Sequence, residues 1–438
     1  MMGTATPPDA SDDHPAEGTA AFLDIDLAAA LRHPDLEALA ARLHAAGPVV
    51  RVPYPAGGEI WVVIDPQLAR EVLADPRLAK DAALAPPHWT EVFSVLGTRS
   101  NPHPGLIAVE GERHRRLRGV HAPAFTRRRI QALEPAIQAT CDRHFDRLAA
   151  FDRPIADAVT EFCYPFPLSV ICDVLGVPEE LRPDLAQASE DMAYGADHAV
   201  RRAGRRLIYR RVEEAVASKA VNPADDLITA LLAVRDDDSA RLTPEELPAA
   251  ITGLIFAGHE TTAGLLAALL LTVLVDPAAK DAVRTDAGAA ALVEQTLRSC
   301  PPSPNTTWRF AAEPLTIGGF HVPARAAVLV SIVAVNHCPA AGHDGARRER
   351  VEHLSFSFGP HYCIGAELAR AEARIAVRTF VERFPAARLG VAESELIWDS
   401  SLLLRRMRSL PIRVSTAAPR TPAAVVAAVA AASPSVTD

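Results

Sequence analysis

The chain of 438 residues lacks several features that would assign it to a common class of protein. Its six cysteines show no C-x-x-C spacing, so the sequence indicates neither a disulfide framework nor a zinc site. The formal net charge is −9, and the absence of excess positive charge argues against general nucleic-acid binding. The most apolar stretch, residues 263–275, has 13 residues, which is too short to span a bilayer but long enough for a buried core helix.

The two ends of the chain differ from the rest in composition. Residues 1–20 and 417–438 are rich in small residues and proline without periodicity, so we expect both to be disordered tails. The N-terminus lacks the basic start and apolar core of a signal peptide, which favours a soluble cytoplasmic protein. Residues 21–416 have an ordinary globular composition without a linker-like stretch, and we expect one large, mainly helical domain there.

A spaced pattern around one cysteine is the strongest signal in the sequence. The pattern F-x-x-G-x-H-x-C-x-G is formed by Phe356, Gly359, His361, Cys363 and Gly365. An apolar periodic run over 366–384 predicts a helix directly after it, so Cys363 would lie near free backbone amides and the positive end of the helix dipole. This setting predicts a lowered thiol pKa and a thiolate that ligates metal. The two glycines would let the backbone turn tightly and approach a flat cofactor, beside an apolar wall from Phe356.

The alternative for Cys363 is a small buried side chain without a role, which is the default for an arbitrary cysteine. The match at five spaced positions reverses that default. The segment resembles the haem-ligand loop of the cytochromes P450. The resemblance covers roughly residues 22–415. It implies the cytochrome P450 fold, mainly α with small β-sheets. Haem b (iron protoporphyrin IX) would lie between a long central helix and the loop from Phe356 to Gly365, which is called the cysteine loop below. The resemblance also implies that Cys363 ligates the haem iron and that its neighbours in the pattern contact the cofactor.

A long helical run over about residues 244–275 contains an unusual polar cluster. The segment Ala257-Gly-His-Glu-Thr-Thr is similar to the A-G-x-[DE]-T-T signature of the family's central helix. A threonine hydroxyl can bond the carbonyl of the preceding turn, and with Gly258 this would open a groove beside the cofactor. The resemblance implies that Thr261 helps to bind and protonate dioxygen, that Glu260 takes part in proton delivery, and that Ala257 contacts the haem. The alternative is a capping or solvent-facing polar patch.

Two further segments match the family's contacts to the haem propionates. His114 and Arg118 are four residues apart, so they share one face of a helix. They are similar to the family's H-x-x-x-R pair, and charge-assisted hydrogen bonds from arginine suit a carboxylate. Arg309, which leads into alternating strands, stands where the family has an arginine for the other propionate. A solvated basic helix is the alternative for the first pair.

One element departs from the family pattern. The family has a Glu-x-x-Arg pair in the helix before these strands, and here Gln295 stands three residues before Arg298. Two substitutes are open: Gln295 could accept a hydrogen bond from Arg298 as a neutral group, or Glu294 could reach it at i, i+4. The loop over residues 336–348 is also shorter than the family's and lacks its usual F-D-x-x-R.

The resemblance implies a haem-thiolate monooxygenase that inserts one atom of dioxygen into a hydrophobic small molecule, by hydroxylation or a related oxidation, as in secondary metabolism. No Rossmann glycine fingerprint or flavin domain is evident, so electrons are expected from an external ferredoxin and its reductase. The basic runs 113–129 and 347–350 would attract an acidic donor to the Cys363 side. Alternatively these arginines only solvate a chain that has three lysines.

A second function remains open at this point: a haem-binding protein of the same fold, with weak or no monooxygenase activity and a binding or regulatory role. Gln295 and the short loop over 336–348 favour it. The intact pair Glu260 and Thr261, together with Cys363, favours the enzyme. The segments expected to line the substrate pocket (82–104, 192–203 and 402–407) are mostly apolar and indicate nothing narrower than a hydrophobic molecule.

Overall fold

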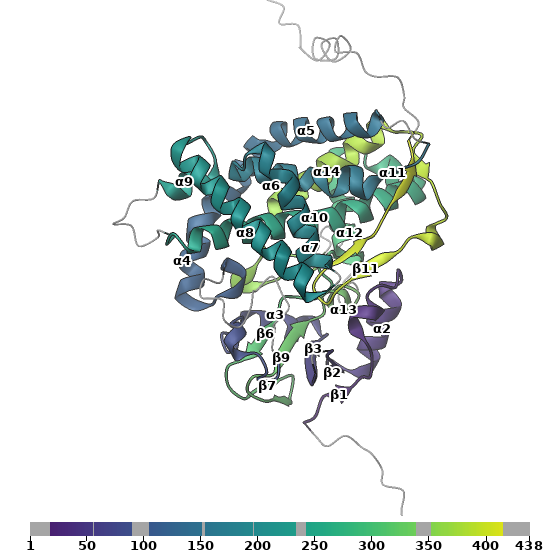
Figure 1. Cartoon of the computed structure of the whole chain (residues 1–438). Helices are drawn as coiled ribbons and strands as arrows, with labels where there is room; N and C mark the ends of the chain where they lie inside the picture. Colours follow the sequence, from purple (N-terminus) through teal and green to yellow (C-terminus); the bar gives the residue numbers. More distant parts are fainter. Residues whose placement is uncertain are drawn as a thin grey trace, which may run out of the picture.

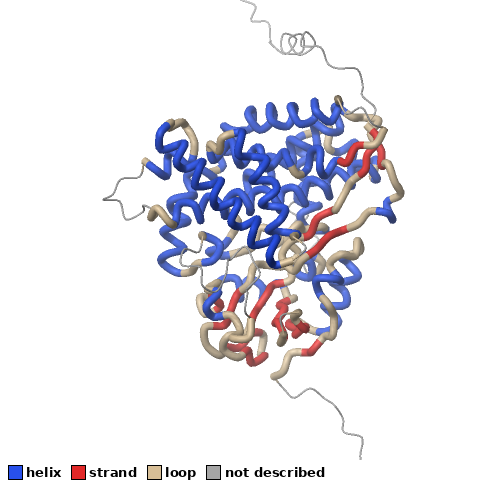
Figure 2. The backbone as a smooth tube through the Cα atoms, viewed as in Figure 1, coloured by secondary structure: helices blue, strands red, loops and turns tan. Residues whose placement is uncertain are grey.

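The structure, a computed structural model, describes residues 18–55, 57–89, 105–150, 154–195, 197–233, 242–338 and 352–414. In these ranges the protein is mainly helical with small sheets, as the sequence predicts (Figure 2). The helices fill the upper part of the view in Figure 1, and the largest sheet lies below them. The helices are α1 (Leu27–Ala30), α2 (Leu36–Ala46), α3 (Pro66–Ala74), α4 (Gly111–His121), α5 (Arg127–Ala149), α6 (Pro165–Leu175), α7 (Arg182–Tyr194), α8 (His198–Val221), α9 (Leu227–Leu232), α10 (Glu246–Val275), α11 (Pro277–Ala282), α12 (Asp286–Ser299), α13 (Ile332–Asn336) and α14 (Ala366–Arg383).

The largest sheet has the strand order β1-β2-β3-β9-β6-β4. The strands are β1 (Ala21–Phe22), β2 (Val49–Pro53), β3 (Glu59–Val63), β4 (Leu78–Ala79), β5 (Ala156–Asp157), β6 (Arg309–Ala311), β7 (Leu315–Ile317), β8 (Phe320–Val322), β9 (Ala327–Val330), β10 (Arg388–Leu389), β11 (Trp398–Ser400), β12 (Arg405–Met407) and β13 (Pro411–Arg413). β3 pairs in parallel with β9, and β9 pairs with β6. β4 pairs with β6 as well, which sets Lys80, the residue after β4, beside the strand that carries Arg309.

Helix α10 is the centre of the helical part. It packs against α14, α6 and α8 and begins two residues later than the predicted run over 244–275. Its length and composition would let it cross a membrane, but 72% of its most apolar window is buried inside the protein. A helix that is apolar nearly all round is stable in water only when other elements cover it, so α10 is a core helix.

Helix α14 follows the cysteine loop and matches the predicted run over 366–384 to within one residue at its end. Its buried positions recur every three or four residues, as at Leu368, Ala371 and Ile375. This face packs against α10, and other contacts join α14 to α5 and α12. The C-terminal end of the cysteine loop is therefore anchored in the core.

The folded part begins slightly earlier than the sequence indicates. Ala20, which we placed in the N-terminal tail, is buried, and its carbonyl oxygen accepts a hydrogen bond from Nε of Arg51 over 3.0 Å. The parallel pairing of β1 with β2 holds the chain at this point. Residues 1–17 and 415–438 lie outside the described residues, so the rest of both predicted tails stays a prediction.

Candidate active site

A cavity of about 340 Å³ collects most of the predicted site residues. It lies among α4, α8, α10 and the loop before α14. The predicted residues that line it are His114, Arg118, Ala257, Thr261, Phe356, His361, Cys363 and Gly365. Three predicted residues do not reach its wall, namely Glu260, Arg309 and Gly359.

The cysteine loop is closed by its own backbone. The amide of Cys363 donates to the carbonyl oxygen of Phe356 over 2.9 Å. Ser357 and Gly359 have φ angles of 63° and 72°, in the left-handed region. A Cβ at Gly359 would also lie 3.1 Å from the carbonyl oxygen of Leu73 at the end of α3, so this position requires glycine. The expected tight turn is present there, and it delivers Cys363 to the start of α14.

The side chain of Cys363 lies inside the protein but is open to the cavity. Burial raises the pKa of its thiol; the amide of Gly365 and the charges of Arg118 and Arg370 oppose this without reversing it. The predicted lowering of the thiol pKa is therefore wrong for the protein chain by itself, because desolvation outweighs the helix end. A metal ion deprotonates a coordinating thiol outright, so a thiolate at this position depends on a metal partner.

One carboxylate fastens the cysteine loop to two helices. Glu294 of α12 accepts hydrogen bonds from Nε and Nη2 of Arg370 over 2.7 and 3.1 Å, and its Oε2 lies 3.1 Å from Nε2 of His353. Burial opposes ionisation of Glu294, but hydrogen bonds from His353 and Arg370 outweigh it and lower its pKa to about 2. The guanidinium of Arg370 lies 4.4 Å from the ring centroid of Phe356 and so holds that ring at the cavity wall. Glu294 therefore pairs with His353 and Arg370 and not with Arg298.

The hypothesis that Gln295 pairs with Arg298 is wrong. The side chain of Gln295 is exposed and makes no hydrogen bond to any residue that the structure describes. Nε of Arg298 donates instead to the carbonyl oxygen of Asn336 over 3.0 Å, and the Asn336 side chain accepts from the amide of Leu354 over 2.9 Å. A neutral asparagine therefore joins α12 to the start of the cysteine loop. Most of the short loop, residues 339–348, lies outside the described residues.

One end of the cavity, the cationic end, has the basic side chains of Lys80, His114 and Arg118 in its wall and Arg309 behind the wall. Nε2 of His114 and Nη1 of Arg309 are buried without a hydrogen-bond partner in the described parts of the chain. Arg118 and Lys80 line the cavity at this end, and Lys80 is hydrogen-bonded to the hydroxyl of Thr307. Burial, and then the charge of Arg309, hold the pKa of Lys80 well below its usual value. Glu110, which pairs with His361 over 2.9 Å, already supplies one negative charge near Lys80 and Arg309, and the remaining positive charge at this end suits further carboxylates.

The arrangement fits a haem. Its two propionates would supply the missing partners of the cationic end, with Arg309 acting from behind Lys80. A Cβ built at Gly365 meets nothing within 4 Å, so the loop leaves open space beside Cys363. Within the described ranges no group of three or more His, Cys, Asp and Glu residues could hold a metal ion. A metal at Cys363 must therefore bring other ligands with it, as the iron of a porphyrin does.

The polar cluster of α10 splits into two parts. The hydroxyl of Thr261 donates to the carbonyl oxygen of Ala257 over 2.8 Å at the cavity wall, as the sequence predicts. Glu260 is buried behind the wall, where its Oε1 accepts a hydrogen bond from the hydroxyl of Tyr164 over 2.6 Å and its Oε2 has no partner. Burial raises the pKa of Glu260 to about 7, although the bond from Tyr164 lowers it. A carboxyl group that titrates near neutral pH can both hold and release a proton.

Sequence reasoning missed two residues of this site. Lys80 could have been noticed as one of three lysines in an arginine-rich chain, but only the pairing of β4 with β6 places it beside Arg309. No sequence pattern pointed to Tyr164 as a site residue. It meets Glu260 because the turn before α6 packs against α10.

The predicted basic run over 113–129 does not form one free surface. Arg113 and Arg116 both pair with Glu246, with Nη2–Oε1 distances of 3.2 and 2.6 Å, and so fasten α4 to the start of α10. The second run, 347–350, lies outside the described residues.

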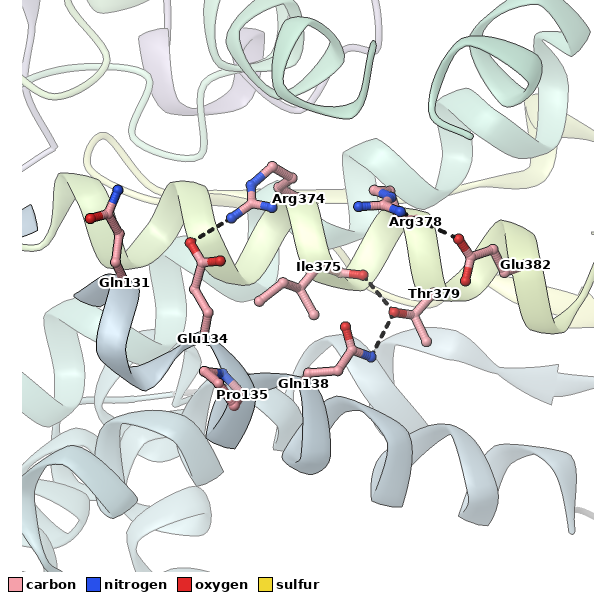
Figure 3. A pocket seen from close by; sticks show the side chains of 9 residues that line it. All are labelled: Gln131, Glu134, Pro135, Gln138, Arg374, Ile375, Arg378, Thr379 and Glu382. Atoms are coloured by element: carbon pink, nitrogen blue, oxygen red, sulfur yellow. Dashed lines mark hydrogen bonds and ion pairs between the residues drawn. The ribbon is translucent and has the colours of Figure 1, made fainter. Parts of the chain in front are cut away.

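A second hollow, of about 400 Å³, lies between α5 and α14 (Figure 3). Arg374 pairs with Glu134 across the groove over 2.6 Å, and Arg378 pairs with Glu382 on the same helix over 3.6 Å. Since its charged side chains are paired with one another, this groove has no evident need of a ligand.

The comparisons with known proteins agree with this site. The family described as Cytochrome P450 matches residues 177–405. Cytochrome P450 monooxygenase PikC of Streptomyces venezuelae is 36% identical over 378 residues, which cover 85% of this chain and 89% of PikC. Cytochrome P-450 monooxygenase DoxA of Streptomyces sp. (strain C5) is 40% identical over 409 residues, with 84% and 92% covered. The solved structure of CxnD, a cytochrome P450 enzyme for C–S bond formation in chuangxinmycin biosynthesis, has a TM-score of 0.81 and 27% identity over 92% of this chain and 99% of CxnD.

The alignments cover nearly the whole length of PikC and DoxA. The family implies a haem cofactor. The mainly helical fold with small sheets, the cavity beside Cys363 and these relatives lead to one conclusion. The chain belongs to the cytochrome P450 family, has its fold and is a monooxygenase.

Proposed function

We propose that this monooxygenase inserts one atom of dioxygen into a hydrophobic small molecule of secondary metabolism, by hydroxylation or a related oxidation, in the cytoplasm. The observation that carries the proposal is that Cys363 and Thr261, from different parts of the chain, face one cavity. Apart from its cationic end, the wall of this cavity is mostly apolar. Its large apolar residues include Leu106, Ile107, Leu254, Phe256, Leu403 and Leu404. Such a wall suits a substrate that buries apolar surface on binding.

The cofactor of the proposal is haem b. Cys363 would bind its iron, and Lys80, His114, Arg118 and Arg309 would hold its propionates. When bound, a thiolate-ligated haem supplies the chemistry that activates dioxygen and cleaves its O–O bond. The chain's own residues contribute binding, orientation, an apolar pocket and protons.

The proton path of the proposal begins at a buried carboxyl group. The hydroxyl of Tyr164 donates a hydrogen bond to Oε1 of Glu260, whereas Oε2 has no partner. Oε2 is therefore the oxygen that would hold the transferable proton. Thr261 is the next residue along the chain and presents its hydroxyl at the cavity wall. We assign Glu260 to hold the proton and Thr261 to present it where dioxygen is activated.

Electrons would come from an external ferredoxin that docks beside the cysteine loop. Phe358 and Tyr362 lie on this loop, one on each side of the turn at Gly359, and are 39% and 41% exposed. The guanidinium of Arg70 lies 5.6 Å from the ring centroid of Phe358. Arg70 also pairs with Glu352 over 3.6 Å. Exposed aromatic rings with an arginine suit the core of a transient interface, and an acidic group of the partner would compete with Glu352 for the guanidinium.

Turnover with a surrogate ferredoxin and its reductase tests the proposal. A hydrophobic compound that shifts the Soret band of the purified protein is incubated with ¹⁸O₂, and the product is analysed by mass spectrometry. We expect one ¹⁸O atom per product molecule and no product from Cys363→Ser. Demonstrated haem reduction and compound binding without any oxygenated product would contradict the proposed function.

Two sequence features favoured the alternative of a haem-binding protein with weak or no activity, and one of them, the departure at Gln295, no longer favours it. The departure at Gln295 does not loosen the cysteine loop, because Glu294 and Asn336 fasten it. The other support, the short loop over 336–348, lies mostly outside the described residues.

A further inference from the structure

We propose that the substrate is an amphiphile with an apolar body and a carboxylate, and that Arg205 and Tyr209 of α8 bind the carboxylate. The inference rests on the proposed function and narrows its substrate class. Both side chains line the cavity, and their spacing of four residues places them on one face of α8. The guanidinium of Arg205 lies 5.7 Å from the ring centroid of Tyr209, so the two polar groups are presented together.

Arg205 differs from other arginines near it because it has no carboxylate partner in the described part of the chain. Arg211, on the same helix, pairs with Asp184 over 2.6 Å. Arg406 of β12 donates two hydrogen bonds to Glu190 over 2.7 and 2.6 Å. The contact that Arg205 makes is with the ring of Tyr209. A half-buried cation that faces a cavity without a counter-ion favours an anionic ligand.

The acid among the residues that line the cavity does not fill this role. Glu372 of α14 is buried, and burial alone raises its pKa, without an opposing contribution from Arg205. Arg205 lies on α8, whereas Cys363 lies on the loop before α14, so a carboxylate held by Arg205 leaves the apolar part of the substrate free to extend along the apolar wall of the cavity.

The chemistry of the pair selects a carboxylate over a neutral polar group. The planar guanidinium donates two parallel hydrogen bonds to the two oxygens of a carboxylate, and the phenol of Tyr209 can donate a third. An alcohol of the same length accepts fewer bonds and leaves the arginine charge unpaired. Charge-assisted hydrogen bonds at a half-buried site correspond to an affinity difference of about tenfold or more.

The test compares dodecanoate with 1-dodecanol, which has the same chain and a neutral head. Binding to the full-length, haem-loaded protein is measured by isothermal titration calorimetry, and the Soret shift checks that the ligand enters the cavity. We expect dodecanoate to bind about tenfold more tightly than dodecanol. Arg205→Gln should abolish this preference, and Tyr209→Phe should reduce it by about threefold. Arg206→Gln, which removes the exposed neighbouring arginine, should leave it unchanged.

Equal affinity for both compounds, failure of dodecanoate to bind, or a preference that survives Arg205→Gln would each overturn the inference. These outcomes are separate from failure of the proposed function. A protein that oxygenates neutral compounds and shows no preference for dodecanoate refutes the carboxylate site alone. A protein that prefers dodecanoate through Arg205 and never yields an oxygenated product refutes the monooxygenase proposal alone.

Discussion

Two hollows in the described part of the molecule differ in the state of their charged groups. The groove between α5 and α14 has about 400 Å³ and the interior cavity about 340 Å³. In the groove, Figure 3 shows Arg374 reaching Glu134 across the gap and Arg378 reaching Glu382. At the cationic end of the cavity, Nε2 of His114 in the wall and Nη1 of Arg309 behind it are buried without a partner among the described residues, whereas Arg378 in the groove is ion-paired and only its Nε has no hydrogen-bond partner.

The difference shows that volume alone does not identify a binding site. A groove whose ions are already paired gains little from a ligand, because the ligand must compete with existing bonds. A cavity that leaves buried donors unpaired carries a desolvation cost that a ligand of complementary charge removes. The following predictions test this contrast, beginning with the largest expected effect.

Cys363→Ser should abolish monooxygenase activity and the spectral signature of thiolate ligation, since a serine hydroxyl is a far weaker iron ligand than a thiolate. The spectrum of the reduced protein under carbon monoxide checks this. Cys300→Ser is the matched control, because its hydroxyl can still accept the hydrogen bond that Arg405 gives to Sγ of Cys300. A thiolate spectrum that persists in Cys363→Ser would exclude Cys363 as the ligand.

Lys80→Met should lower haem affinity by about tenfold and at the same time stabilise the haem-free protein. The ligand loses a charge-assisted partner, whereas the empty site loses a buried charge with a desolvation cost. Haem transfer to apomyoglobin and thermal melting of the haem-free form measure the two effects. If both quantities fall together, Lys80 is only a structural residue and the contrast with the groove does not hold at this position.

Glu260→Gln should make stability less dependent on pH between about 4.5 and about 7. Burial raises the pKa of Glu260 in the folded protein from 4.5 to about 7, so its contribution to stability is full below pH 4.5 and is lost as the pH rises through 7. Glutamine does not titrate and keeps an oxygen for the hydroxyl of Tyr164. Melting temperatures of both proteins across this range measure the difference, which should shift in favour of the variant as the pH rises. A constant difference would show that Glu260 does not titrate there.

Arg374→Gln should have the smallest effect, a loss of at most about 1 kcal/mol in the free energy of unfolding with haem affinity unchanged. Its pairs with Glu134 and Asp286 are partly exposed, and such pairs contribute little because water screens them. Chemical denaturation and the haem-transfer assay check both quantities. A large loss of haem in this variant would mean that the groove takes part in cofactor binding after all.

Much of the fold and part of the site could be predicted because their signals are local. The helix over 366–384 and the core helix over 244–275 followed from apolar periodicity, and the loop around Cys363 followed from residue spacing. The turn at Gly359 needed only the knowledge that glycine tolerates a positive φ.

The rest depended on contacts between distant parts of the chain. The bond from Tyr164 to Glu260 joins residues 96 positions apart, and no local pattern marks it. The contact between Glu294 and Arg298 that helix spacing allows does not form, because packing of α12 on α14 brings Arg370 to Glu294. The thiol pKa of Cys363 was mistaken because the helix end is a local feature and burial is not.

The central claim is that Cys363 and the basic residues at the cationic end of the cavity together hold a thiolate-ligated haem. The most direct test is the absorption spectrum of the purified full-length protein, reduced with dithionite under carbon monoxide. The structure predicts the strongly red-shifted Soret band of an iron–thiolate complex. A band at the shorter wavelength of neutral-thiol or histidine ligation would contradict the assignment of Cys363 as a thiolate ligand, and absence of a haem band would contradict the cavity as a haem site.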